Sequence, residues 1–428
     1  MRWRTVLGIL LLGFLVSGCH VGIVAQPVTA PPAPTAIPLA THPPAAPTSS
    51  PAAAPTEWPA VSPSAPTALP ATPAPTPYPT RVVPPPEPVA LPAGFGISVY
   101  AAGLNGPRMM ALGPDGQLYL AERGNGRVVR LPDRDGDGVA DAVEVVAAGL
   151  QFPSSIAFDR GGALYVGETA RVLRLSAPDA QGVFQVQEVV VAGLPTGGHS
   201  TRTVLPSPDG QWLYVSIGSS CNVCLEDDER RATIMRYTVD GAAGTVYARG
   251  LRNAVGLAFR PGTEELWATN NGRDLLGDDL PPETVNRVTA GADFGWPRCH
   301  AGRIVDPEFG SAGACEGVTA PAVEMQAHSA PLGLTFYAGT QFPSEYQGDL
   351  FVAFHGSWNR SVPTGYKVVR IPFEAGRPGP VEDFATGWLR ADGSAWGRPV
   401  DVLTAPDGSL WVSDDGEGRI YRIFFAGR

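Results

Sequence analysis

Lysine is almost absent from this 428-residue chain, since Lys367 is its only lysine and arginine supplies the other basic residues. The chain carries 31 basic and 41 acidic residues, for a net charge of −10. Neutralisation of phosphates by basic residues dominates nucleic-acid binding, so an acidic chain without a basic block is unsuited to that role. Long amphipathic helical patterns are also scarce, which argues against an all-α fold.

No apolar run near the N-terminus is long enough to span a bilayer comfortably: the run at residues 6–16 is too short. It follows Arg2 and Arg4 and leads into the string VSGC, which is similar to the bacterial lipobox. We therefore predict a signal peptide over residues 1–18 and a lipid anchor on Cys19. The anchor would hold an exported protein at the outer face of the cell membrane, extracellular or periplasmic. An ordinary signal peptide with an incidental cysteine is the alternative.

Proline is concentrated in one segment, with 23 of the 45 prolines between residues 26 and 92. The segment is otherwise rich in alanine, threonine and serine, and Glu57 is its only charged residue before Arg81. Such a composition cannot bury enough apolar surface to fold. We expect residues 19–92 to form a disordered, extended stalk and residues 93–428 to form the globular domain.

Cysteine is scarce but even in number after Cys19, and an exported protein permits disulfides. We expect the pairs Cys221–Cys224 and Cys299–Cys315, although four cysteines allow three pairings. A redox-active dithiol at Cys221 and Cys224 is possible. A structural disulfide is favoured in an oxidising compartment.

A short strand pattern recurs six times. Each copy begins with leucine and an aromatic residue and alternates with the period of a strand. The copies start at Leu118, Leu164, Leu213, Leu266, Leu350 and Leu410. A further strand pattern precedes each copy, another follows it, and outer strands close the units.

Six units of four strands predict an all-β, six-bladed β-propeller. The strand pattern at residues 97–102 resembles an outer strand but precedes the first unit, and the chain ends on an inner strand at 419–425. We therefore expect the first strand to complete the last blade, which closes the ring. A β-sandwich is the rival fold.

In a propeller, the loops entering the innermost strands and the loops after the second strands open on one face. Many arginines and three of the four histidines of the globular part fall on these loops, and grouped guanidinium groups are suited to binding carboxylates. Residues expected at this channel mouth include Arg108, Arg123, Asn125, His199, Arg202, Arg252, Asn253, Asn271, Arg273, His328, His355 and Arg398.

Several strings of this part of the chain resemble those of the PQQ-dependent sugar dehydrogenases, the soluble aldose dehydrogenases and their sorbosone dehydrogenase-like relatives. They are GGHSTR (197–202), RGLRN (249–253), NGRD (271–274), GDDLPP (277–282), FGWP (294–297) and HGSWNR (355–360). The resemblance implies a propeller that binds pyrroloquinoline quinone (PQQ) with Ca²⁺. It also implies oxidation of an aldose or related sugar by hydride transfer to PQQ, and passage of the electrons to a membrane quinone or other acceptor.

The resemblance also implies roles for individual residues. His199 would be the base that accepts the proton of the anomeric hydroxyl, and an ordinary histidine pKa near 6.5 suits that task. Arg252 would lie against the reactive carbonyl of the cofactor. The remaining matches are Asn253, Asn271, Gly272, Arg273, His355 and Arg398 as cofactor contacts, the backbone carbonyls of Gly272 and Arg273 as Ca²⁺ ligands, and Trp296 beside the sugar.

Three positions depart from the glucose-oxidising branch of that family. Val400 stands where the branch has a second arginine, and His355 where it has a lysine. Asn271 and Arg273 flank Gly272 where it has Gln-Gly-Pro. The contacts to PQQ are therefore altered, glucose is not assumed as the substrate, and the sorbosone-type branch is the nearer likeness.

A second calcium signal lies at residues 133–144, which fit the EF-hand loop pattern DxDxDG-x5-E. Its expected ligands are Asp133, Asp135, Asp137, Val139 through its carbonyl, Asp141 and Glu144. Strands flank the loop, so we expect a structural ion on the face opposite the channel mouth. A polar acidic hairpin without an ion is the alternative.

Two rival functions remain. A calcium-dependent lactonase shares the propeller shape but needs side-chain carboxylates around a channel calcium, and these are not evident in the sequence. A non-catalytic surface binding module is the other, because fold does not fix function.

Overall fold

The computed structural model describes residues 81–427. They lie within the second of two compact units, residues 72–428. The predicted signal peptide, Cys19 and the stalk up to residue 80 lie outside the described residues.

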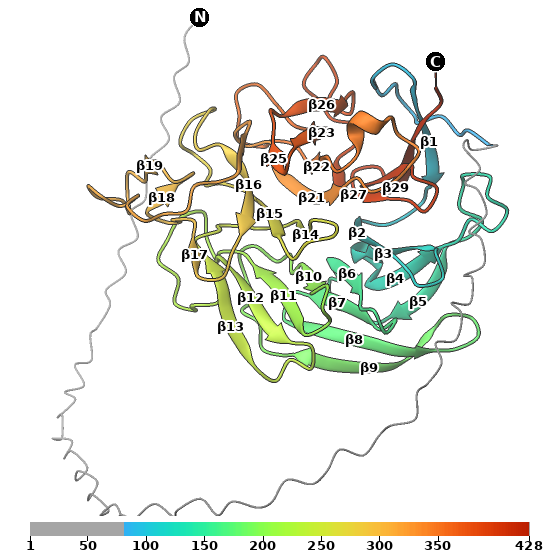
Figure 1. Cartoon of the computed structure of the whole chain (residues 1–428), viewed down its shortest axis with the longest axis horizontal. Helices are drawn as coiled ribbons and strands as arrows, with labels where there is room; N and C mark the ends of the chain where they lie inside the picture. Colours follow the sequence, from blue (N-terminus) through green and yellow to red (C-terminus); the bar gives the residue numbers. More distant parts are fainter. Residues whose placement is uncertain (1–80, 428) are drawn as a thin grey trace, which may run out of the picture. The chain divides into compact units, whose positions relative to one another are not determined.

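Six four-stranded antiparallel units follow one another in sequence order, as in the predicted propeller (Figure 1). The first blade contains β2 (Pro107–Leu112), β3 (Leu118–Glu122), β4 (Arg127–Leu131) and β5 (Glu144–Ala148). The second contains β6 (Ser155–Phe158), β7 (Leu164–Glu168), β8 (Arg171–Pro178) and β9 (Phe184–Val191). The third contains β10 (Val204–Pro206), β11 (Trp212–Ile217), β12 (Thr233–Thr238) and β13 (Gly244–Arg249).

The other three blades complete the ring. The fourth contains β14 (Leu257–Phe259), β15 (Leu266–Asn270), β16 (Glu283–Val288) and β20 (Val323–Met325). The fifth contains β21 (Pro331–Phe336), β22 (Leu350–Phe354), β23 (Lys367–Ile371) and β26 (Glu382–Ala385). The sixth contains β27 (Pro399–Thr404), β28 (Leu410–Asp414), β29 (Arg419–Phe425) and β1 (Phe95–Ala101).

The last blade is built from both ends of the described chain. Strand β1 pairs antiparallel with β29, in a register that joins Ile97 to Ile423, and the two strands lie side by side in Figure 1. This confirms the predicted closure of the ring. Closure removes the exposed sheet edge between the first and last blades.

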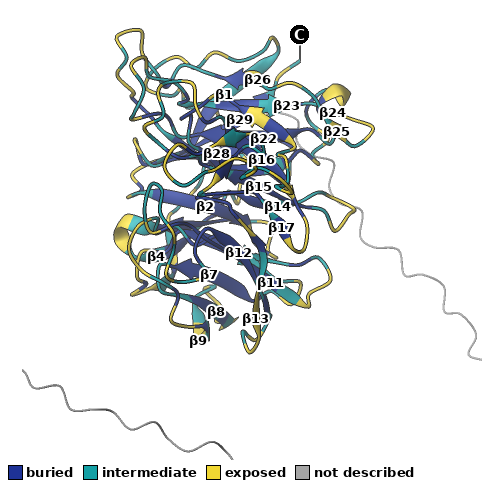
Figure 2. Ribbon diagram, turned by 90° about the vertical axis from the view of Figure 1, so that its left-hand side faces the viewer, coloured by how far each residue is buried: buried dark blue, intermediate teal, exposed yellow. Residues whose placement is uncertain are grey.

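The recurrent leucine–aromatic strands form the interfaces between blades. In β3, Leu118 and Leu120 face a cluster that includes Trp411 of the sixth blade. The alternate residues Tyr119 and Ala121 face a cluster shared with the second blade. The strand pattern therefore buries both faces of one blade against two neighbours, and the dark-blue strands of Figure 2 run through the interior while the loops are exposed.

The structure departs from the regular sixfold pattern in three places. In the third blade, β17 (Ala292–Asp293) adds a short parallel pair to β13. The insertion before β20 carries β18 (Cys299–His300) and β19 (Ile304–Val305). A hairpin of β24 (Phe373–Glu374) and β25 (Arg377–Pro378) precedes β26.

The globular part begins earlier than predicted. Val83 and Val89, placed in the stalk by composition, pack against the core of the last two blades. Ala90 forms a β-bridge with Thr386. Apolar residues at these positions explain the difference, because they give this proline-rich segment a surface to bury.

Helix is confined to two 3₁₀ turns within residues 81–427, η1 (Arg123–Asn125) and η2 (Ser344–Tyr346). None of the helices in this part of the chain could cross a membrane.

Candidate active site

His199 lies on the loop that enters β10, at the channel mouth, and is half-buried. Its Nδ1 is 3.0 Å from the carbonyl oxygen of Ser219 and 3.0 Å from the hydroxyl of the same residue. A carbonyl oxygen can only accept, so Nδ1 carries the hydrogen and Nε2 keeps a lone pair. The Ser219 hydroxyl donates to the carbonyl of Cys221 at 2.6 Å, which leaves its own lone pairs facing Nδ1.

The pKa of His199 is lowered to about 4, first by burial and then by the positive charge of Arg252. Arg202 and Arg231 add to the effect. His199 is therefore neutral at pH 7. It presents a free imidazole nitrogen, which is the form a general base requires.

Two buried arginines hold the loop that carries His199. Arg202 donates to the carbonyl of His199 at 2.8 Å. Arg231 donates to the carbonyl of Gly197 at 2.9 Å. Because the terminal nitrogens of both side chains donate to backbone carbonyls, these arginines fix the loop and keep a positive potential around the imidazole.

Arg252, buried on the loop that enters β14, is anchored by Asn222. Its Nε donates to the Asn222 carbonyl at 2.9 Å and its Nη2 to the Asn222 Oδ1 at 3.0 Å. The same Nη2 pairs with Asp274 at 2.8 Å, and Asn222 Nδ2 donates to the Asp274 carbonyl at 3.0 Å. Asn222 thus fixes the guanidinium through its backbone and its side chain together.

Gly272 lies beside Arg252, whose Nη1 donates to the Gly272 carbonyl at 2.6 Å. The Gly272 N–H donates to the carboxylate of Glu283 at 2.6 Å. Burial raises the pKa of Glu283 to about 7. The carbonyl predicted as a calcium ligand is therefore at the site, where it accepts a hydrogen bond from Arg252, and the N–H of the same residue is held by a buried acid.

The two asparagines predicted as cofactor contacts flank this pair. Asn271 is buried, and its Nδ2 donates to the Pro331 carbonyl at 2.9 Å. The buried Oδ1 of Asn253 accepts no hydrogen bond from any residue in the range 81–427. A methyl group placed on Gly218 would lie 2.6 Å from that oxygen and 2.6 Å from Cβ of His199, so Asn253 and His199 are neighbours.

The side chains of Arg273 and Trp296 make contacts that the resemblance does not describe. Arg273 forms ion pairs with Asp306 and Glu308 of the insertion. Trp296 is only 8% exposed, and its Nε1 donates to the Asn222 carbonyl at 3.3 Å. Trp296 therefore supports the turn that holds Arg252, and it lines one pocket with Arg252 and Gly272, so its place beside the sugar stays a prediction.

A second charged group at the mouth centres on Asp415. Its carboxylate lies 2.8 Å from His355 Nε2 and 2.9 Å from Arg108 Nη1. Its pKa is held at about 2, because these partners outweigh the effect of burial. Arg398 joins the group by donating to the His355 carbonyl at 3.2 Å.

Val400 forms part of an apolar plug directly beneath the mouth. It clusters with Met109, Val255 and Leu332, which are all buried and lie on, or just before, the inner strands of their blades. Below the plug, the six inner strands enclose a cavity of about 310 Å³ that contains Asp401. The replacement of arginine by valine is therefore compensated locally by apolar packing.

The predicted calcium loop joins β4 and β5, on the face opposite the mouth. Ligand oxygens of Asp133, Asp135 and Asp137 gather within 4.8 Å of one another. Glu144 instead pairs with Arg130 at 2.6 Å and with Arg134. Part of the ligand set is assembled, and binding of an ion there stays a prediction.

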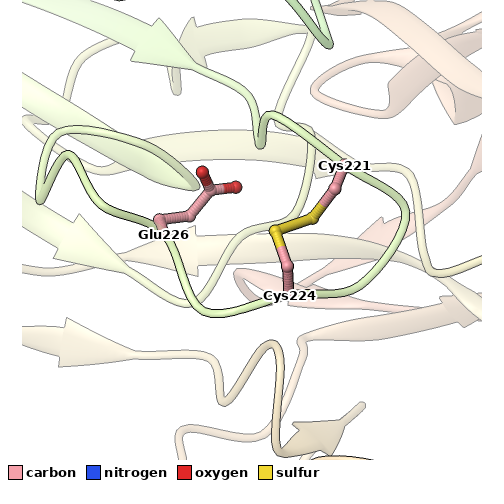
Figure 3. A group of neighbouring side chains, drawn as sticks. All are labelled: Cys221, Cys224 and Glu226. Carbon is pink, nitrogen blue, oxygen red and sulfur yellow. A yellow bond between two sulfur atoms is a disulfide. The ribbon is translucent and has the colours of Figure 1, made fainter. Parts of the chain in front are cut away.

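Both predicted disulfides are present, Cys221–Cys224 and Cys299–Cys315. Figure 3 shows the first, on a loop that also carries Glu226. Its cysteines are paired with each other, which excludes a metal site with Glu226. This disulfide closes the turn that carries Asn222, while the second closes the insertion of the fourth blade.

Sequence reasoning missed Ser219, Asn222, Glu283 and Asp415. Asp415 follows β28 in the same register in which Arg123 follows β3, so the repeat alignment could have identified it. Asn222 gave no signal beyond the cysteine pair around it.

Comparisons with known proteins identify a family and several relatives of this chain. The family described as "Domain of unknown function (DUF7133)" matches residues 88–415. An uncharacterised protein of Borreliella burgdorferi is 36% identical over 232 residues, covering 53% of this chain and 61% of that protein. A pyrroloquinoline quinone-dependent pyranose dehydrogenase of Coprinopsis cinerea is 25% identical over 406 residues, covering 77% of this chain and 54% of that enzyme. The chain thus spans little more than half the length of these two relatives.

Among solved structures, the holo form of the PQQ domain of the Coprinopsis cinerea pyranose dehydrogenase superposes with a TM-score of 0.70. The match has 24% identity and covers 79% of this chain and 98% of that domain, which confirms the propeller fold. The sequence comparison confirms the resemblance to PQQ-dependent sugar dehydrogenases, and the structure comparison shows the same fold. By the extent of the family match, this chain is a member of the DUF7133 family.

Proposed function

We propose that the chain is a PQQ-dependent sugar dehydrogenase that oxidises an aldose or related sugar. The observation that carries the proposal is the joint placement of His199 and Arg252. One segment, residues 219–222, fixes the hydrogen of the imidazole on Nδ1 and orients the guanidinium. A neutral base beside a fixed cation suits abstraction of a hydroxyl proton next to a centre that gains negative charge.

The residues of the mouth fit an anionic, planar cofactor such as PQQ. Arg108, Arg123 and Arg398 supply guanidinium groups for carboxylates, and their charge exceeds that of Asp415. The apolar plug gives a flat ring system a dry floor, and the unpartnered Oδ1 of Asn253 offers a polar contact. The carbonyls of Gly272 and Arg273 are hard oxygen donors of the kind that Ca²⁺ binds.

PQQ, when bound, supplies the hydride-accepting carbonyl. The chain's own residues perform the acid–base and positioning steps. His199 takes the sugar hydroxyl proton on Nε2, while Ser219 keeps the Nδ1 hydrogen in place. Arg252 remains protonated and stabilises negative charge nearby.

The electron acceptor, a membrane quinone or another carrier, and a lipid anchor at Cys19 belong to the same proposal. The VSGC string supports attachment at the outer face of the membrane. Lipid attachment would be measured by mass spectrometry of the exported protein.

A lactonase function has no support from the residues of the channel mouth. Among residues 81–427, three or more acidic, histidine or cysteine side chains bring their ligand atoms within 4.8 Å of one another at two places. These are the calcium loop and the Cys221–Cys224 turn. Neither provides a ring of carboxylates around the channel. The cavity below the plug contains the single acid Asp401.

Reconstitution of the purified chain with PQQ and Ca²⁺ tests the proposal. We expect sugar-dependent reduction of a redox dye, and we expect His199→Ala to bind PQQ but to lose at least about 100-fold in kcat. Leu225→Ala, at a solvent-exposed position, serves as the control. Lactone hydrolysis without PQQ, or full activity in His199→Ala, would overturn the assignment.

A further inference from the structure

A groove of about 520 Å³ opens on the same face as His199, between the loops of the first two blades. Arg123 and Thr169 reach it from loops that follow second strands, whereas Phe152 and Thr196 reach it from loops that enter inner strands. The groove lies beside the cofactor site proposed above and shares Arg123 with it.

Phe152 is the largest apolar side chain in the groove and is 63% exposed. Its φ of 53° is in the left-handed region, which costs a bulky residue free energy. The neighbouring backbone is fixed, since Leu150 N–H donates to the Gly126 carbonyl at 2.9 Å and Gln151 N–H to the Glu168 carboxylate at 2.5 Å. The loop is therefore anchored in a conformation that leaves the ring largely exposed, with the Arg123 guanidinium over the ring at 5.7 Å from its centroid.

Two hydrogen bonds connect the groove to the loop of His199. Arg123 Nη2 donates to the Ser200 hydroxyl at 2.9 Å. Thr169 Oγ1 donates to the Ser200 carbonyl at 3.3 Å. Since Ser200 directly follows His199, the groove adjoins the loop that carries the imidazole.

The chemistry of the lining is that of a carbohydrate subsite. A flat aromatic ring packs against the C–H face of a pyranose. Gln151, Thr169, Thr196 and Arg123 offer the amide, hydroxyl and guanidinium groups that its hydroxyls can bond. The volume falls within the range of about 300–1,000 Å³ that is typical of small-molecule sites.

We propose that this groove binds a second sugar unit of the substrate. The inference rests on the proposed function and specifies its substrate class, an oligosaccharide whose reducing-end unit lies at His199. Phe152 stacks on the next unit, and the anchored loop holds the ring ready for it.

The experiment compares a monosaccharide with its trisaccharide, using the glucose, cellotriose, maltotriose and xylotriose series. We expect the ratio of kcat/KM for the preferred trisaccharide to that of its monosaccharide to exceed about 10. Phe152→Ala should lower this ratio at least about fivefold, the effect of losing one aromatic contact. Phe152→Tyr should retain it.

Folding effects are separated by Phe152→Gly, which removes the ring but accepts the positive φ without strain. It should match Phe152→Ala in the ratio while melting at the wild-type temperature or above. Val189→Ala, which truncates a 50% exposed residue of β9 outside the groove, is the matched control and should keep the ratio.

Calorimetric titration of the same trisaccharides into the protein without PQQ tests the subsite independently of turnover. We expect a binding heat, with a dissociation constant that Phe152→Ala raises at least about fivefold and His199→Ala leaves unchanged. If no sugar is oxidised but the trisaccharide binds, the subsite stands and the proposed dehydrogenase fails. Equal kcat/KM for monosaccharide and trisaccharide, or trisaccharide binding unaffected by Phe152→Ala, overturns the subsite.

Discussion

At His199, burial and nearby positive charge both lower the pKa of the imidazole. Both disfavour the imidazolium, because desolvation penalises the charged form and Arg252, Arg202 and Arg231 repel it. The hydrogen bond from Nδ1 to Ser219 opposes them but is the smaller effect. The result is a histidine that stays neutral over a wide pH range and whose free nitrogen is set by its neighbour.

This balance predicts the pH dependence of His199. In the protein without cofactor, the imidazole should titrate with a midpoint near 4, well below the usual 6.5. As the pH falls through the midpoint of the cofactor-bound protein the base is lost, so sugar oxidation should fall on the acid side and stay level above it. Arg252→Met should raise the midpoint only in part, since burial is the larger cause.

Proton NMR of the His199 ring, assigned by difference with His199→Gln, measures the midpoint directly. A value at or above 6.5 in the wild-type protein would contradict the described environment. An anionic cofactor offsets the arginine charges, so PQQ should shift the midpoint upward.

At the scale of elements, the turn closed by Cys221 and Cys224 is the main positioning device of the site. It presents Asn222, which bonds Arg252 through two acceptors and Asp274 through a donor. The disulfide in Figure 3 limits the freedom of this turn and so lowers the entropic cost of holding Asn222 in place.

Removing the disulfide or the asparagine should therefore loosen Arg252. We expect Asn222→Ala, and Cys221→Ser combined with Cys224→Ser, to lower kcat about tenfold or more, in keeping with the loss of hydrogen bonds to a charged group. KM for the sugar should change less than kcat. Leu225→Ala, on the same loop and 71% exposed, should leave both constants unchanged. A double cysteine variant with wild-type kcat would show that the turn holds its shape without the crosslink.

The three clustered aspartates of the β4–β5 loop lead to a separate prediction about metal removal. Calcium bound by Asp133, Asp135 and Asp137 would offset the repulsion between these carboxylates, so chelation should lower the melting temperature. Asp135→Asn should abolish most of that response, which distinguishes this loop from calcium at Gly272. A melting temperature that chelator leaves unchanged in the wild-type protein would exclude an ion in the loop.

At the scale of the whole molecule, the closed ring of six blades was predictable because the repeated residues are those that pack between blades. Leu118 and Tyr119 have counterparts in every blade, and their alternation alone indicates strands buried on both faces. The pairing of β1 with β29 followed from the order of inner and outer strand patterns.

For much of the candidate site, the sequence predicted which residues lie at the channel mouth but not which residues they contact. The repeat alignment brought His199, Arg252 and Gly272 to one face, where the structure has them. It could not show that Arg273 pairs with Asp306 in the insertion, or that Asn222 holds Arg252, because those contacts depend on loop conformations that no strand period encodes.

The four apolar residues beneath the site, Met109, Val255, Leu332 and Val400, have a consequence for the order of events. They block passage along the axis of the ring, so the reaction centre has a single entrance. In the proposed enzyme, the sugar and the electron carrier must then use this entrance one after the other, and the protein must store two electrons after the oxidised sugar leaves and before the carrier binds.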